Sequence, residues 1–364
     1  MIHKLISGGV SFFIIFMLYV PPVFGQEKLL RVAVAGMSHD HIHVLLQQYK
    51  QKRVVITGIA EPDKTRIANL RKHYMLPDSL FYDTVAEMLS ATRPDVVLAY
   101  NPISEHVSVA EACLPQKIPL MVEKPLAITN KQARKISDLS KRYGTPVFTN
   151  YETTWYGSNH ALKQHLEQSG SGPLKRMIAK DGHQGPREIG CSEIFLDWLT
   201  DPEKNGGGAL IDFGCYGANL MTWLMNGERP VAVTAVTRQV KPAVYPDVDD
   251  DATILLEYKN GATGIIEASW NWPYGIKSFE VYGTQLSLHA TDANTLIRAE
   301  SIENVQKLQV SDAYFKDQIA YLEAVFTGEA VTKNDLSSLE NNLIVVEILQ
   351  AARQSAKEGK RIVL

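Results

Sequence analysis

The sequence predicts an α/β protein with a doubly wound parallel sheet at the N-terminus and a second α/β domain built on a large, mainly antiparallel, open sheet. Up to about residue 150, short and continuous apolar runs alternate with helical patterns, which is typical of a parallel sheet covered on both faces. Beyond that point, apolar strands joined by an Asn-Gly turn indicate antiparallel pairing. The order of the two textures predicts two domains in sequence.

Length and composition agree with this class. The chain has 364 residues, of which 45% are hydrophobic and 21% charged, so it can fill two hydrophobic cores. Its net charge of −3 favours neither nucleic acid nor an acidic membrane surface as a partner. The three cysteines, Cys113, Cys191 and Cys215, lack metal-type spacing and cannot all pair, so a disulfide scaffold is excluded.

Residues 1–25 are predicted to be a signal peptide. Lys4 precedes an apolar run over residues 10–20, and Val23-Phe24-Gly25 offers a cleavage site before Gln26. The run is shorter than the roughly 20 residues that a membrane span needs, which favours cleavage over a retained anchor. We therefore expect an exported, periplasmic protein without a stable membrane anchor.

The first domain is expected over residues 26–149. Its strands are predicted over residues 30–35, 54–60, 96–100, 119–122 and 146–148. The second domain, residues 150–364, is expected to bind substrate and mediate oligomerisation. It contains a predicted hairpin with strands 253–258 and 262–269, further strands over 231–237 and 279–282, and helices over 313–326 and 336–357, the last of which could pack back on the first domain.

The turn after the first strand has a partial dinucleotide fingerprint. Gly36, Ser38 and His41 occupy the three positions of G-x-G-x-x-G, where a pyrophosphate would meet backbone N–H groups at a helix start. Glu61 ends the second strand, where an acid accepts hydrogen bonds from the adenosine ribose. The alternative is an ordinary strand–turn–helix with a surface glutamate. If the cofactor interpretation holds, Glu61 favours NAD over NADP, although Lys64 and Arg66 lie nearby in the chain.

A cluster of histidines follows Gly36. His39, His41 and His43 raise the alternative of a hydrolase metal site, because a His-x-His pair after a strand suits a metal. The sequence offers no later carboxylate or histidine cluster that completes a ligand set. We therefore expect no metal and interpret the histidines as polar residues at a helix N-terminus, with His39 and His41 near the cofactor.

Lys124 provides the strongest functional signal. It follows a buried strand within Glu123-Lys124-Pro125 and so stands at the carboxyl edge of the sheet, where α/β folds bind ligands. This motif, with the Asn101-Pro102 turn and His106, resembles the oxidoreductase family named after glucose-fructose oxidoreductase, inositol 2-dehydrogenase and MocA (Gfo/Idh/MocA).

A second motif supports the resemblance. Residues 206–216 are similar to the family's glycine-rich entry to an active-site helix, and Asp212 and Tyr216 share one helix face. Many members have histidine where this chain has Tyr216, so it resembles the tyrosine-containing, glucose-fructose oxidoreductase branch. The alternative is a capping acid and a half-buried core phenol.

The resemblance implies a Rossmann-type nucleotide domain, NAD or NADP as cofactor, a sugar or polyol substrate, and a homo-oligomer (dimer or tetramer) formed through the open sheet. Lys124, Tyr216 and Asp212 are then the catalytic residues. Tyr216 would be the base, its pKa lowered from about 10 by Lys124, and Asp212 would orient the substrate or Lys124. The predicted cofactor-binding residues are Gly36, Ser38, His39, His41, Glu61, Asn101, His106, Glu123 and Lys124.

Substrate contacts are predicted from two segments. Residues 181–205 are expected to form a long loop or lid that holds His183, Arg187 and Trp198. Trp270, with Trp272 and Tyr274, could stack on a sugar ring or belong equally to the core or an interface. Residues 249–251, three consecutive aspartates, are interpreted as a solvated entry to a strand.

The expected function is an NAD(P)-dependent oxidation at a hydroxyl of a sugar, polyol or glycoside. Because free nicotinamide cofactor is scarce outside the cytoplasm, an exported enzyme is expected to hold its cofactor tightly. Three alternatives remain: a glycoside-cleaving enzyme that uses transient oxidation and elimination, a cofactor-binding protein without turnover, and a metal-dependent hydrolase.

Overall fold

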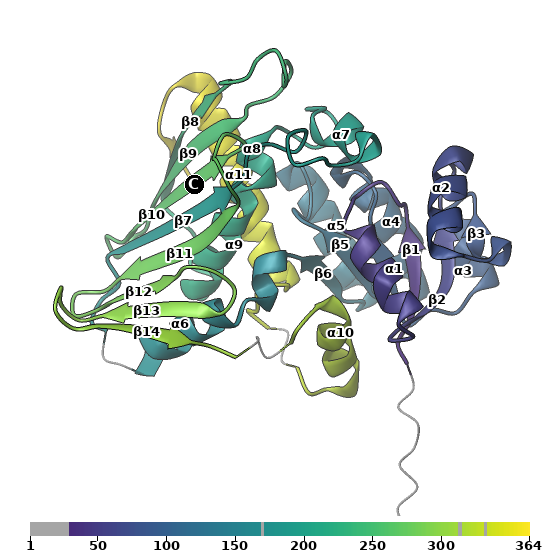
Figure 1. The fold of residues 1–364 in the computed structure, drawn as a ribbon, viewed down its shortest axis with the longest axis horizontal. Coiled ribbons are helices and arrows are strands. Elements are labelled where there is room, and N and C mark those ends of the chain that lie inside the picture. The colour runs from purple at the N-terminus through teal and green to yellow at the C-terminus, as the bar shows by residue number, and fades with distance from the viewer. Residues whose placement is uncertain (1–28, 169–170, 312–314, 331–332) are drawn as a thin grey trace, which may run out of the picture.

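The computed structural model describes residues 29–168, 171–311, 315–330 and 333–364, which form two sheets with helices between and around them (Figure 1). The predicted signal peptide lies outside these ranges. None of the helices described is both long and apolar enough to cross a bilayer.

The first sheet has six parallel strands in the order β3-β2-β1-β4-β5-β6, which confirms the predicted doubly wound topology. The strands are β1 (Arg31–Ala35), β2 (Val55–Ala60), β3 (Phe81–Tyr82), β4 (Val96–Ala99), β5 (Leu120–Glu123) and β6 (Val147–Asn150). Both faces of β4, β5 and β6 are buried, as continuous apolar runs require. β2 and β3 lie on one side of β1, and β4, β5 and β6 lie on the other. The strand order therefore switches between β1 and β4, and a crevice forms at this switch point.

Five helices connect these strands: α1 (Ile42–Lys50), α2 (Lys64–Tyr74), α3 (Val85–Ala91), α4 (His106–Cys113) and α5 (Asn130–Tyr143). Local signals fix their ends. Thr84 and Thr129 form capping boxes with the residue three positions later, at the starts of α3 and α5. Gly144 ends α5 with φ of 62°.

The second sheet has nine strands in the order β14-β13-β12-β11-β7-β10-β9-β8-β15. They are β7 (Arg176–Gly182), β8 (Ala232–Arg238), β9 (Asp251–Glu257), β10 (Thr263–Ser269), β11 (Ile276–Tyr282), β12 (Ser287–Ala290), β13 (Thr295–Ala299), β14 (Val305–Gln309) and β15 (Ile362–Val363). The predicted hairpin is β9–β10, with Gly261 at φ of 82° in its turn. The sequence did not predict β7, which pairs parallel to β10 and makes the sheet mixed.

Helices pack on one side of this sheet, toward the first domain (Figure 1). They are α6 (Gly157–Gln168), α8 (Ala209–Asp212), α9 (Gly214–Leu224) and α11 (Leu339–Glu358). A further helix, α10 (Gln318–Thr327), packs into the hydrophobic core of the first sheet. α9 contacts β7 and β10, and α11 contacts α9, β8, α5 and β6. The last long helix therefore joins the two domains.

The expected long loop over 181–205 is wrong in part. β7 extends to Gly182, and α7 (Glu193–Leu199) forms inside the segment. The hydroxyl of Ser192 accepts the N–H of Phe195 at 3.2 Å, which caps α7. The apolar face of α7 packs into the core through Phe195 and Trp198, so the segment is fixed.

The interpretation of residues 249–251 as a solvated strand entry is also wrong. Asp249 accepts the N–H groups of Gly208 (3.0 Å) and Leu210 (2.7 Å) and so holds the start of α8. Asp250 is fully buried and accepts the N–H groups of Val240 and Lys241, each at 2.7 Å. The backbone donors of distant loops, rather than water, satisfy these carboxylates.

We predict that Asp249→Ala lowers the free energy of unfolding by about 1–3 kcal/mol, because two backbone donors lose their acceptor. Urea titration of the purified protein measures this difference. Asp247→Ala, at an exposed neighbour, is the control and should change stability by less than about 0.5 kcal/mol. Equal effects in the two variants would contradict the assigned role of Asp249.

Candidate active site

An ion pair between Lys124 and Asp212 joins the two domains. Lys124 follows β5 at the carboxyl edge of the first sheet, and Asp212 ends α8 of the second domain. The Nζ of Lys124 is paired with Oδ1 of Asp212 and donates to its backbone carbonyl at 3.0 Å. Both side chains are buried. Two residues far apart in the sequence thus form one charged unit.

The pair is ionised. Burial acts to raise the pKa of Asp212, but the Lys124 ammonium outweighs it and the pKa lies below its usual value. Burial acts to lower the pKa of Lys124, and Asp212 again reverses the direction. Trp270 donates its indole N–H to Oδ2 of Asp212 at 3.0 Å. Trp270 is fully buried, so the prediction that it stacks on a sugar is wrong, and its role is to hold Asp212.

Tyr216 is buried beside this pair. The Nζ atoms of Lys124 and Lys277 each lie 5.1 Å from its ring centroid. Burial raises the pKa of Tyr216 well above 10, and the carboxyl of Glu152 and the thiol of Cys215 act in the same direction. The expectation that Lys124 lowers this pKa is therefore wrong, because burial and the neighbouring acidic groups raise it. Tyr216 is a neutral phenol that can donate a proton or a hydrogen bond.

A cavity of about 540 Å³ lies at the switch point of the first sheet. Gly36, Ser38, Glu61 and Asn101 line it, as predicted for a cofactor site, together with Arg66, Trp198 and Lys204. Gly36 has φ of +74°, and a Cβ there would stand 2.7 Å from the Cβ of Asn101. Glycine is therefore required at position 36. The other residues predicted to bind the cofactor do not line this cavity: His39, His41, His106, Glu123 and Lys124.

In the loop after β1, which carries the dinucleotide fingerprint, most backbone N–H groups already have hydrogen-bond acceptors. Met37 donates its N–H to Glu61 at 2.9 Å, and Ser38 and His39 donate theirs to the carbonyl of Tyr100 at 3.0 and 2.9 Å. The side chains of Arg66 and Lys204 supply positive charge in the same cavity. These residues fit a dinucleotide, and Arg66 and Lys204 are the side chains that would hold its phosphates.

Glu61 lines this cavity but is already engaged. Its carboxylate accepts hydrogen bonds from Asp63 N–H (3.0 Å), Met37 N–H and Arg66 Nη1 (2.9 Å). Arg66 also lies 3.7 Å from Asp63. The carboxylates of Glu61 and Asp63 therefore neutralise the charge of Arg66, the nearest cation that a 2′-phosphate could contact.

α7 covers the fingerprint loop. Trp198 donates its indole N–H to the carbonyl of Ser38 at 3.1 Å, and Ser192 donates its N–H to Asp40 at 2.9 Å. The ring of Phe195 lies 4.6 Å from that of His39. Trp198 was predicted to contact substrate; instead it is buried against the cofactor loop.

His106 is fully buried and does not reach the cavity, contrary to the prediction. Its Nδ1–H donates to the carbonyl of Leu126 at 3.1 Å. Burial lowers the pKa of His106 to about 4, so it is neutral at pH 7. Its contribution is to hold the turn that follows Lys124.

His39, His41 and Glu123 come together, with one possible ligand atom from each within 4.8 Å of the others. The expectation that no later carboxylate joins the histidines is therefore wrong. However, Nδ1 of His39 accepts the N–H of His41 at 3.1 Å, whereas a metal-bound histidine donates from its second nitrogen. The donor arrangement fits a hydrogen-bonded cluster better than a metal site.

A second cavity of about 540 Å³ lies over β11 and β12, near Tyr216. His183 and Tyr274 line it, as do Glu152, Lys277, Ser278, His289 and Thr291. Arg187, another predicted substrate residue, pairs with Glu193 at 3.5 Å on the exposed surface. Sequence analysis missed Glu152 and Lys277, because neither lies in a motif. They form an ion pair between the segment after β6 and β11.

Two sequence models match the chain. One describes an oxidoreductase family with an NAD-binding Rossmann fold and covers residues 30–151. The other describes the GFO/IDH/MocA C-terminal domain and covers residues 159–289. Both domains are thus matched in the expected order.

Curated proteins and solved structures are also similar to this chain. The rhizopine catabolism protein MocA of Rhizobium meliloti is 27% identical over 260 residues, which cover 70% of this chain and 74% of that protein. An aldose-aldose oxidoreductase from Caulobacter crescentus, solved with glycerol, aligns with a TM-score of 0.77 at 19% identity over 93% of this chain and all of that one. An inositol dehydrogenase homologue from Azotobacter vinelandii, solved with NAD⁺, gives 0.78 at 16% identity over 93% and 98%.

We predict that Asp212→Asn lowers the free energy of unfolding by about 3–5 kcal/mol at pH 7, because the Lys124 charge stays buried without its partner. Since the pKa of Asp212 lies below its usual value near 3.8, the stabilisation is present above that pH and is lost as the pH falls below it. Urea titrations at pH 7 and pH 3 measure both effects. Glu111→Gln, which breaks an exposed pair with Lys135, is the control and should cost less than about 1 kcal/mol. A loss that stays constant with pH would contradict the prediction.

Proposed function

Because the chain belongs to the GFO/IDH/MocA oxidoreductase family, whose N-terminal domain is an NAD-binding Rossmann fold, we propose that it oxidises a hydroxyl group of a sugar, polyol or glycoside. The observation that carries this proposal is the Lys124–Asp212 pair. It stands at the carboxyl edge of the first sheet, and its neighbour Tyr216 adjoins the second cavity through Lys277.

When bound, NAD supplies a hydride acceptor. The ammonium of Lys124 donates hydrogen bonds to Asp212 and can donate a further one to the oxygen of a substrate hydroxyl. Asp212 holds this ammonium in place, and Trp270 holds Asp212. Tyr216, a neutral phenol, donates a hydrogen bond to the same oxygen. This arrangement binds a carbinol oxygen with two donors.

The second cavity supports a polyhydroxylated substrate. Its side chains include Glu152, Lys277, His289 and Thr291, and Tyr274 adds an exposed ring. Alternating donors and acceptors next to an aromatic surface suit the two faces of a sugar ring.

The cofactor is proposed to be NAD that exchanges slowly. α7 contacts the fingerprint loop at Ser38, His39 and Asp40 and would cover a bound pyrophosphate. Glu61 favours NAD over NADP, because it engages Arg66 and repels a 2′-phosphate. If the predicted signal peptide exports the chain, reduction and reoxidation within one cycle avoid dependence on free cofactor. Sugar-to-sugar transfer and glycoside cleavage by transient oxidation both meet that condition.

Lys124→Ala is expected to lower turnover by at least about a hundredfold, because the substrate oxygen loses its charged donor. The affinity for NAD should change much less. A screen of sugars, polyols and glycosides with NAD⁺, followed by absorbance of the reduced nicotinamide, measures turnover, and quenching of protein fluorescence measures binding. Near-normal turnover of the variant would falsify the assignment of Lys124, and inactivity of the wild type toward every probe would contradict the proposed function.

Purification without added cofactor should yield protein that releases near-stoichiometric NAD on denaturation. Trp198→Phe, which removes the N–H that holds Ser38, should lose NAD on dialysis at least several times faster than the wild type. Trp223→Phe is the control, because Trp223 does not line the cofactor cavity. An empty wild-type site that binds NAD only at millimolar concentration, with NADH released at each turnover, would show that the cofactor is not retained.

A further inference from the structure

Oxidation of a hydroxyl needs a group that accepts the hydroxyl proton, and the predicted catalytic residues do not supply it. Lys124 and Tyr216 already hold their protons, since the pKa of each is raised: Asp212 overcomes the effect of burial at Lys124, and burial acts at Tyr216. Asp212 is ionised, but Lys124 occupies one of its oxygens and Trp270 the other. The acceptor must come from elsewhere in the site.

Other neighbours are also unsuitable. His183 accepts the N–H of Gly185 on its Nδ1 at 2.9 Å, so its neutral form carries the proton on Nε2. Glu152 accepts from Tyr156 on one oxygen and from Lys277 on the other. Asp181 is buried, and burial raises its pKa well above the usual value, so it is protonated.

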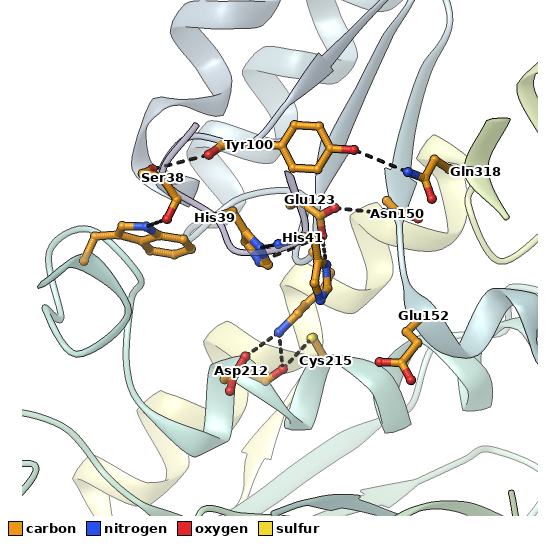
Figure 2. Close-up of polar contacts among 12 residues, drawn as sticks. Ser38, His39, His41, Tyr100, Glu123, Asn150, Glu152, Asp212, Cys215 and Gln318 are labelled. Atoms are coloured by element: carbon orange, nitrogen blue, oxygen red, sulfur yellow. Dashed lines mark hydrogen bonds and ion pairs between the residues drawn. The ribbon is translucent and has the colours of Figure 1, made fainter. Parts of the chain in front are cut away.

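His41 has the geometry that these residues lack. Its Nδ1–H donates to Oε2 of Glu123 at 2.9 Å, and Asn150 donates to Oε1 of Glu123 at 2.8 Å. The indole N–H of Trp155 in turn donates to Asn150 at 3.2 Å. Figure 2 shows Glu123 between His41 and Asn150. Each hydrogen bond orients the next, as in a carboxylate–histidine dyad.

The dyad leaves one nitrogen of His41 open. Because Nδ1 carries the proton toward Glu123, Nε2 is the lone-pair nitrogen, and no residue of the described ranges hydrogen-bonds it. The His41 side chain is 35% exposed, whereas that of Glu123 is 2% exposed. A buried carboxylate thus stands behind an accessible imidazole, and it is ionised: burial opposes this, but His41, His39 and Asn150 hold its pKa at about 2.

His41 also lies between the two halves of the site. Glu123, which His41 contacts, directly precedes Lys124. Glu152, which lines the second cavity, lies close enough to His41 to interact with it electrostatically. The charged and titratable groups that face His41 are Glu123 from β5, His39 from its own loop and Glu152 after β6. A substrate hydroxyl held by Lys124 would therefore be near the imidazole.

We propose that His41, oriented by Glu123, is the general base of the reaction, a role that rests on the proposed oxidation. The substrate O–H bond breaks and its proton passes to Nε2 of His41, while the carbinol C–H pair leaves as hydride to the oxidised nicotinamide and the C=O bond forms. In a redox-neutral cycle the same nitrogen returns the proton when the hydride returns. This role also explains why histidine stands where the fingerprint has its third glycine.

The first test reads the tautomer without any substrate. Long-range ¹H–¹⁵N correlation spectra of the histidine-labelled protein should show His41 with Nδ1 protonated and Nε2 free, assigned by loss of the signal in His41→Asn. Glu123→Gln should abolish this preference, because the amide no longer demands the Nδ1 proton. His43→Asn, two residues further on in α1 and hydrogen-bonded to Tyr74, is the matched control and should leave the His41 signal unchanged. An Nε2–H tautomer of His41 in the wild type would overturn the proposal.

The second test uses glucose and myo-inositol with NAD⁺ as probes, extended by any sugar found in the screen. His41→Asn should lower kcat by at least about a hundredfold with NAD affinity within about threefold, and His43→Asn should behave as wild type. Added imidazole should restore part of the rate of His41→Ala. Turnover of His41→Asn within threefold of the wild type would overturn the assignment. An inactive wild type would instead refute the proposed oxidation, and the tautomer would then decide whether the dyad itself exists.

Discussion

The buried Lys124–Asp212 pair is the interaction on which the rest of the structure depends. Two charges inside a protein are tolerated only when they meet with good geometry and further hydrogen bonds. β5 must therefore end opposite α8, although the two belong to different domains. Asp249 fixes the start of α8, and Trp270 satisfies the remaining oxygen of Asp212. α11, which packs against elements of both domains, keeps them in this register.

The sequence predicted the parts of the molecule whose signal is local. Continuous apolar runs predicted the parallel sheet, and Asn260-Gly261 predicted the central hairpin. Lys124 and Asp212 were found because each lies in a short motif at an element boundary. β7 was missed because Asp181, a buried acid on the face turned toward the helices, interrupts its apolar alternation.

What the sequence could not show is contact between residues far apart in the chain. The aspartates at 249 and 250 looked solvated because their donors, around Gly208 and Val240, belong to other loops. Trp270 looked like a stacking surface because a sequence does not show which side of a strand end faces a buried carboxylate. Likewise, His41 looked like a defect in a fingerprint until Glu123, 82 positions later, was seen beside it. Positions that break a local rule often carry function for this reason.

The second cavity has a consequence for how such a chain can change. Lys124, Glu123 and His41 belong to the first domain, and the dinucleotide crevice lies at the edge of that domain's sheet, whereas Tyr274, Ser278, His289 and Thr291 of the second cavity sit on or beside strands of the second sheet. Under the proposed function, substitutions at those four positions would alter which hydroxyl groups are recognised and would leave the hydride and proton acceptors where they are. Natural or engineered variation at these positions would then change substrate preference without changing the residues that carry out the reaction.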